Sequence, residues 1–294
     1  MNISMNARKY FIRIAYIFGI TLVLINIYGK TQSIRHPDLL SFDKHGGEFT
    51  PIEISSYNFN SINSQSVYLN RKEALQKVRE VLQIENEHDK IIAIQKLVTA
   101  SMVHFYPVNK PYLSDYFHVP LYENFILYFG ARLYEITRLK PLSVFRPYEY
   151  LNGKKSWERG AAMCGEISSV VMYLLDKAGI ENGKAGLDGH VIALARTSND
   201  EQYIIDADYG FTLKGSLSDI ANYHTEDVRK ISGSSHLSNI YGPEGNIEFW
   251  TGDRGYRPKG YWFERISYFL KWVIPLMLIM FPFYLSKSNK GIYL

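Results

Sequence analysis

The sequence predicts an α+β domain in which helices pack on a short antiparallel sheet. Apolar residues recur at three- and four-residue spacing over 71–84 and 91–102, which is typical of amphipathic helices. A third stripe with this spacing follows Cys164. Two apolar runs, 190–195 and 202–206, flank the polar connection 197–201 and predict an antiparallel hairpin. A chain of 294 residues is long enough to bury a substantial core around these elements.

Two apolar segments bracket the polar middle of the chain. Segment 10–28 follows Arg8 and Lys9, exceeds the usual length of a signal-peptide core and is not followed by a small-residue cleavage pattern. We therefore expect an uncleaved membrane helix, with a cleaved signal peptide as the alternative. Segment 266–285 has the length of a bilayer core and tolerates its two prolines in a membrane helix. Its alternative is a buried C-terminal helix of a globular domain.

These segments predict a two-pass protein of the cell membrane, with the lipid bilayer as a partner. Basic residues lie outside both apolar runs, so the tails 1–9 and 286–294 are expected in the cytoplasm. The middle, 31–265, is then periplasmic or extracellular in a bacterial cell. It begins with a loop-rich stretch to residue 70 that could carry a short strand, and a further helix is expected over 121–136.

Composition excludes several classes of protein. The chain has one cysteine, so it has no intramolecular disulfide and is not a disulfide-stapled secreted module. Its net charge of +4 is spread along the sequence, which gives no footprint for nucleic acid. We expect no cofactor and no metal ion.

Cys164 stands at the start of the predicted helix 164–178, which Gly179 ends. A helix N-terminus stabilises a thiolate and lowers the pKa of a cysteine below about 8.5. The backbone N–H of Cys164 could also receive the oxyanion of a tetrahedral intermediate. Trp157 is a candidate for the second oxyanion donor, and Glu166 is expected to face solvent. Taken alone, a lone cysteine at this position is more often core packing.

His190 and Asp206 are predicted to be cross-strand neighbours in the hairpin. A turn centred near 198–199 brings His190 opposite residues 206–208. Asp208 shares a face with Asp206 and is the alternative carboxylate to orient the histidine. The spacing does not decide whether this hairpin packs against the start of the Cys164 helix.

The order of these residues and the sequence motifs around them resemble those of the transglutaminase-like superfamily. The resemblance covers about 88–215 and rests on AMCGEISSVVMYLLDKAGI, GHVIALA, YIIDADYG and the helix HDKIIAIQKLVTASMVHFY. It implies a papain-like core in which Cys164 is the nucleophile, His190 the base and Asp206 the orienting carboxylate. The chain departs from the family pattern at Val191, where an aromatic residue is usual, at Lys184, where arginine is common, and in its short connection from Gly179 to His190.

The resemblance implies thiol-dependent acyl transfer at an amide, with hydrolysis expected because water is the default acceptor. Protein or peptide amides of the cell envelope are the expected substrates, on grounds of topology. Two alternatives use the same residues differently. One is a non-catalytic binding or scaffolding module in envelope or polysaccharide assembly. The other is a divalent-metal site formed by Asp188, His190, Asp206 and Asp208.

Overall fold

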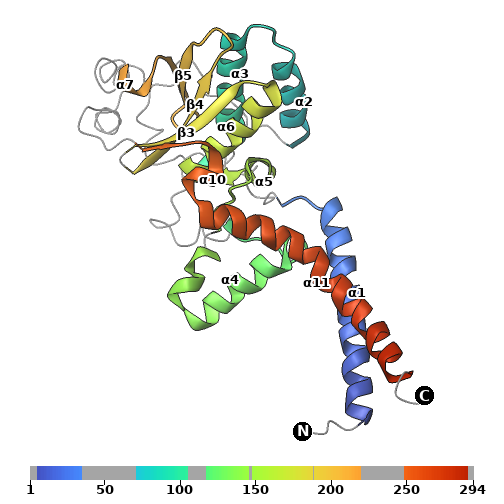
Figure 1. Ribbon diagram of the computed structural model, residues 1–294. Helices are drawn as coiled ribbons and strands as arrows, with labels where there is room; N and C mark the ends of the chain where they lie inside the picture. The colour runs from blue at the N-terminus through green and yellow to red at the C-terminus, as the bar shows by residue number, and fades with distance from the viewer. Residues whose placement is uncertain are drawn as a thin grey trace, which may run out of the picture. The chain divides into compact units, whose positions relative to one another are not determined.

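The computed structural model describes residues 5–34, 71–104, 117–145, 148–187, 189–219 and 248–290 (Figure 1). Contacts divide the chain into two compact units. The first consists of Met1–Ile34, His118–Tyr148 and Trp262–Leu294, and the second of Arg35–Phe117 and Glu149–Tyr261. The helix-rich stretch after residue 117 thus groups with the two terminal segments. Segment 35–70, where a short strand was considered, lies outside the described residues.

The second unit is built on a five-stranded sheet in which all neighbours are antiparallel. Strand β4 lies at its centre, and the hairpin from β4 to β5 that the sequence predicted is confirmed. A separate parallel pair joins β1 (Val103–His104) and β2 (Ala161–Ala162). In spatial order the five strands are β6 (Phe211–Lys214), β5 (Gln202–Asp206), β4 (His190–Arg196), β3 (Glu181–Leu187) and β7 (Glu248–Trp250).

Helices cover one face of this sheet (Figure 1). Apolar side chains of α2 (Arg71–Leu82), α3 (Glu87–Ser101) and α6 (Cys164–Ala178) form one core with residues of β4 and β5. The predicted helices and the α+β class are therefore confirmed. The unit also contains α5 (Gly153–Arg159), the short α7 (Leu217–Asp219) and α10 (Gly252–Tyr256).

Each face of the sheet carries a buried apolar cluster, and successive side chains of a strand point to opposite faces. Ala193 and Ala195 of β4 face the helices, whereas Ile192 belongs to a second apolar cluster on the opposite face. That second cluster also contains Ala185, Leu187, Ile204, Tyr209, Phe211 and Leu217.

Strand β3 differs from the sequence-based expectation, in which its residues form a short connection to His190. Its sequence, ENGKAGL, has two glycines and a lysine and so lacks the usual strand composition. Packing against the neighbouring strand explains why a segment of this composition forms a strand. A Cβ on Gly186 would lie 2.2 Å from the Trp250 ring, so the glycine makes room for an aromatic side chain of the neighbouring strand.

The first unit contains α1 (Met5–Thr31), α4 (Phe125–Thr137), the 3₁₀ helix η4 (Lys140–Phe145) and most of α11 (Pro258–Lys290). Within the described residues, one helical stretch, Tyr10–Thr31, is long and apolar enough to cross a membrane, and a signal sequence would have the same properties. Segment 266–285 is helical as expected, and its spanning of a membrane remains a prediction.

Helices α1 and α11 pack closely around Pro275. A proline has no N–H to donate to the carbonyl four residues earlier, here that of Lys271. The buried side chain of Asn26 donates to this carbonyl from α1 at 2.6 Å. A Cβ on Gly19 would lie 2.9 Å from the Pro275 carbonyl oxygen, so glycine permits the close approach. The proline that weakens the α11 helix is thus accommodated by its neighbour.

Close packing of α5 against α6 gives a test of the second unit. A Cβ on Gly153 would lie 2.1 Å from the Ser169 carbonyl oxygen, whereas one on Gly183 would meet nothing nearer than 3.4 Å. We expect Gly153→Ala to lower the free energy of unfolding by about 1–3 kcal/mol through overpacking, and Gly183→Ala to change it little. Urea denaturation of the full chain in detergent measures both. Equal losses in the two variants would contradict this packing.

Candidate active site

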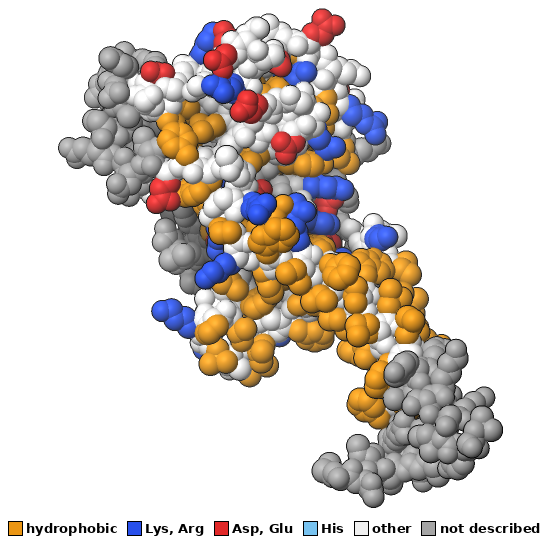
Figure 2. Space-filling view, in the orientation of Figure 1, with side chains coloured by type: hydrophobic (Ala, Val, Ile, Leu, Met, Phe, Trp, Pro, Cys, Tyr) orange, Lys and Arg blue, Asp and Glu red, His pale blue; other side chains and the backbone are white. Residues whose placement is uncertain are grey.

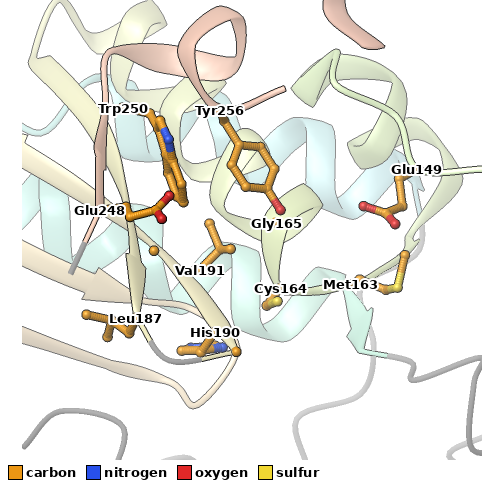
Figure 3. A pocket seen from close by; sticks show the side chains of 12 residues that line it. Glu149, Met163, Cys164, Gly165, Leu187, His190, Val191, Glu248, Trp250 and Tyr256 are labelled. Carbon is orange, nitrogen blue, oxygen red and sulfur yellow. The ribbon is translucent and has the colours of Figure 1, made fainter. Parts of the chain in front are cut away.

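A cavity of about 520 Å³ in the second unit contains both Cys164 and His190 (Figure 3). Its walls come from the start of α6, the adjoining ends of β3 and β4, strand β7 and helix α10. The lining residues are Glu149, Met163, Cys164, Gly165, Gly186, Leu187, Gly189, His190, Val191, Glu248, Trp250 and Tyr256.

Cys164 is the first residue of α6 and is partly exposed. Ser168, one turn later, ties this turn to the sheet. Its hydroxyl lies 2.9 Å from the Cys164 carbonyl oxygen and 2.8 Å from that of Val191. Val191 follows His190 on β4, so the hairpin packs against the start of the cysteine helix. The structure therefore brings together the two parts whose contact the spacing left open.

Asp206 is the carboxylate that holds His190. Its Oδ2 lies 2.9 Å from the Nε2 of His190, and both side chains are almost fully buried. The other oxygen, Oδ1, accepts the backbone N–H of Tyr209 at 3.1 Å, which fixes the carboxylate in the turn after β5. The alternative, Asp208, lies in this turn with its Oδ2 4.0 Å from the Nδ1 of His190. The two carboxylates therefore flank the ring.

Two influences compete on the protonation of His190. Burial would lower its pKa, but the charge and hydrogen bond of Asp206, together with the interaction with Cys164, raise the pKa well above 6.5. The raised pKa favours the protonated, positively charged imidazole. A cationic ring that interacts with a thiol favours the thiolate, which is the nucleophilic form of cysteine.

Glu166 is buried, contrary to the expectation that it faces solvent. Its Oε1 accepts the Tyr150 N–H at 2.7 Å, its Oε2 accepts the Met163 N–H at 3.2 Å, and it forms a buried ion pair with Arg159. Burial raises the pKa of Glu166 to about 7, although Arg159 opposes this. These partners offset the burial of its charge, and the carboxylate braces the turn that carries Cys164.

Lys184 of β3 is fully buried and contacts the same turn. Its Nζ donates to the Gly165 carbonyl at 2.7 Å and to the Ser169 hydroxyl, and it forms an ion pair with Asp253 of α10. The ammonium also lies 4.7 Å from the centre of the Tyr256 ring. Burial lowers the pKa of Lys184, while Asp253 opposes that effect. This one side chain connects β3, α6 and α10.

The structure does not bring Trp157 to the cavity, because its side chain is buried in the core with the helices. Tyr256 lies there instead, with its hydroxyl 2.8 Å from the position that a Cβ on Gly165 would occupy. In Figure 3 this hydroxyl points toward the turn that carries Gly165 and Cys164. Burial and the negative charge of Glu149 raise the pKa of Tyr256 to about 12, so the phenol remains a hydrogen-bond donor.

Four lining residues were not predicted from the sequence: Tyr256, Trp250, Glu149 and Glu248. The first two and Glu248 lie in the run EFWTGDRGY over 248–256, beyond the region of the family resemblance. The one feature of the sequence that could have indicated them is the clustering of aromatic and acidic residues in this run.

The proposed metal cluster has no support among the described residues. No group of three or more His, Cys, Asp or Glu side chains within them could hold a metal ion. Asp188, one of its four predicted ligands, lies outside the described residues.

Comparison with known proteins yields no relative: no family model, no curated protein and no solved structure matches the chain.

The raised pKa of His190 can be tested by comparing the two carboxylates. We expect Asp206→Asn to lower the pKa of His190 and Asp208→Asn to change it much less, because Asp206 holds the hydrogen bond. Titration of the ring resonances by NMR measures this pKa.

The same shift predicts a pH dependence of stability. A histidine whose folded-state pKa is raised adds stability that is fully present below pH 6.5 and is lost as pH rises through the folded-state pKa. Asp206→Asn should remove this contribution to stability.

In the NMR titration, a larger effect of Asp208→Asn than of Asp206→Asn on the pKa of His190 would assign the orienting role to Asp208.

Proposed function

We propose that this chain is a membrane-anchored thiol enzyme that acts on amide bonds of a protein or peptide in the cell envelope. One observation carries the proposal: Cys164, at the start of a helix, shares a cavity with His190, whose Nε2 is hydrogen-bonded to buried Asp206. The order of cysteine on α6, histidine on β4 and aspartate at the end of β5 fits the papain-like core of the transglutaminase-like superfamily.

The proposed reaction begins with attack of the Cys164 thiolate on the amide carbonyl carbon. The carbonyl oxygen becomes an oxyanion, which receives hydrogen bonds from the Cys164 N–H and the Tyr256 hydroxyl. The His190 imidazolium then gives its proton to the leaving amine, and an acyl-enzyme remains. Water next attacks the thioester while His190 takes a proton from it, and the acid leaves with the thiol restored. Asp206 keeps the Nε2 of the ring occupied, so Nδ1 is the nitrogen available for this proton transfer.

The proposed location is the cell membrane, with both α1 and α11 as spans and both termini in the cytoplasm. Pro275 leaves the Lys271 carbonyl without its helical partner, and Asn26 of α1 donates a hydrogen bond to this carbonyl. This hydrogen bond supports the proposal that α1 and α11 cross a bilayer together. Large exposed apolar side chains on α1, α4 and α11 support contact with lipid (Figure 2). These include Phe11, Ile14, Leu24, Phe129, Ile136, Phe269, Met277 and Met280. The second unit would then face the periplasm or the cell exterior.

The proposed activity predicts an unusually reactive thiol at the chain's sole cysteine. We expect iodoacetamide to alkylate Cys164 faster at pH 7 in the folded chain than in the urea-unfolded chain, and His190→Ala to remove this difference. Incubation with envelope extracts should leave an acyl adduct on Cys164 that mass spectrometry identifies.

Cys164→Ser is the control for adduct assignment, since the chain then has no thiol. A thiol no more reactive than in the unfolded chain, together with an unchanged cellular phenotype of Cys164→Ala, would overturn the proposed activity. A non-catalytic binding module would be the remaining reading.

Tyr256→Phe separates an oxyanion donor from a structural residue. The rate of acyl-adduct formation should fall about 10²-fold, the usual loss when one oxyanion donor is removed. Alkylation by iodoacetamide forms no oxyanion, so its rate should stay unchanged. Trp157, the oxyanion donor expected from the sequence, is buried away from the cavity. Trp157→Phe should therefore leave the ratio of the acylation rate to the alkylation rate as in the natural chain. An unchanged acylation rate in Tyr256→Phe would show that Tyr256 is not a donor.

A further inference from the structure

The described lining of the cavity is acidic. It contains Glu149 and Glu248 and no lysine or arginine. In Figure 3 the two carboxylates lie on opposite sides of Tyr256, and Cys164 lies between and below them. A substrate that enters from solvent therefore meets negative charge before it reaches the thiol.

The basic side chains packed around this site already have carboxylate partners. Lys184 pairs with Asp253 and Arg159 pairs with Glu166. Arg257 pairs with Glu149, which offsets the charge on that side of the cavity. Glu248 is exposed and has no ion pair with the described residues. Among the described residues, its charge is therefore the one at the mouth of the cavity left to act on a ligand.

An aromatic wall adjoins Glu248. Trp250 is two residues further along β7, so the two side chains leave the strand on the same face. Trp250 packs over Gly186 and meets Tyr256 edge to face, with ring centres 4.8 Å apart. A carboxylate next to an indole face suits an alkylammonium or guanidinium group, whose charge is attracted to both and whose apolar stem packs on the ring.

We infer that the cavity selects an acyl donor that carries a positively charged side chain beside the reacting amide, with this charge at Glu248 and its stem against Trp250. A carboxylate at the same place is repelled. The inference rests on the proposed function, since it names the substrate class of that site.

The sole cysteine provides a test that needs no known substrate. Methanethiosulfonates react when a thiolate attacks their sulfur, which forms a disulfide and releases methanesulfinate. Rates at Cys164 of full-chain protein in detergent are compared for the cationic trimethylammonium-ethyl reagent, the anionic sulfonatoethyl reagent and the neutral methyl reagent. We expect the cation-to-anion rate ratio to exceed that of the urea-unfolded chain, and Glu248→Gln to lower it about three- to tenfold at low ionic strength.

Matched variants separate Glu248 from general charge effects. Glu181→Gln removes an exposed carboxylate at the opposite end of β3 and should leave the ratio unchanged. Glu248→Lys should lower the ratio further than Glu248→Gln. A ratio that Glu248→Gln does not change, or that equals the ratio of the unfolded chain, would overturn the inference.

The neutral reagent distinguishes this failure from failure of the proposed activity. A Cys164 that reacts no faster with it in the folded than in the unfolded chain overturns the activity itself. A reactive Cys164 without charge preference overturns only the substrate class. Two peptides that differ only in having lysine or glutamate beside the reacting amide test the substrate class directly. The lysine peptide should acylate Cys164 faster than the glutamate peptide, and Glu248→Gln should reduce the difference between the two acylation rates.

Discussion

The candidate site depends on how the first turn of α6 is held against the sheet. Ser168 reaches the carbonyl of Val191 on β4, and Lys184 donates from β3 to the carbonyl of Gly165. These contacts fix the cysteine relative to the histidine that precedes Val191. Lys184 also pairs with Asp253, which keeps α10 beside the same turn. A single buried ammonium thus positions both the proposed nucleophile and the element that carries the proposed oxyanion donor.

Buried charge is a costly way to hold a turn, because desolvation offsets much of the Coulomb attraction. Buried charge does fix the position of the turn, since a buried ammonium or carboxylate that loses its partners strongly destabilises the fold. Arg159 and Glu166 act in this way on the cysteine turn, and so do Lys184 and Asp253. Both pairs leave little net charge. His190 with Asp206, and Glu248 at the mouth, are then the charges that a thiol and its substrate encounter directly.

Local patterns predicted the parts of the site that are close in sequence. The helix after Cys164 and the hairpin that carries His190 and Asp206 follow from periodicity and turn chemistry, and the structure has both. Glu166 was assigned wrongly because its partners, Arg159 and the Tyr150 N–H, belong to another helix and a loop. Tyr256 and Trp250 were missed because they follow the hairpin at long range. Only tertiary packing brings them to the cysteine, where Gly165 and Gly186 make room for their rings.

The buried contact between α1 and α11 differs in kind from the contacts around the cysteine turn. In the second unit, ionic partners surround the cysteine turn. In the first, a buried hydrogen bond between α1 and α11 is uncharged: Asn26 donates to a backbone carbonyl that Pro275 deprives of its helical partner. An amide is better suited than an ammonium to a helix that crosses lipid, because it needs no counter-ion there. Pro275 therefore supports the pairing of α11 with α1, because the carbonyl that it leaves free is the one that Asn26 binds.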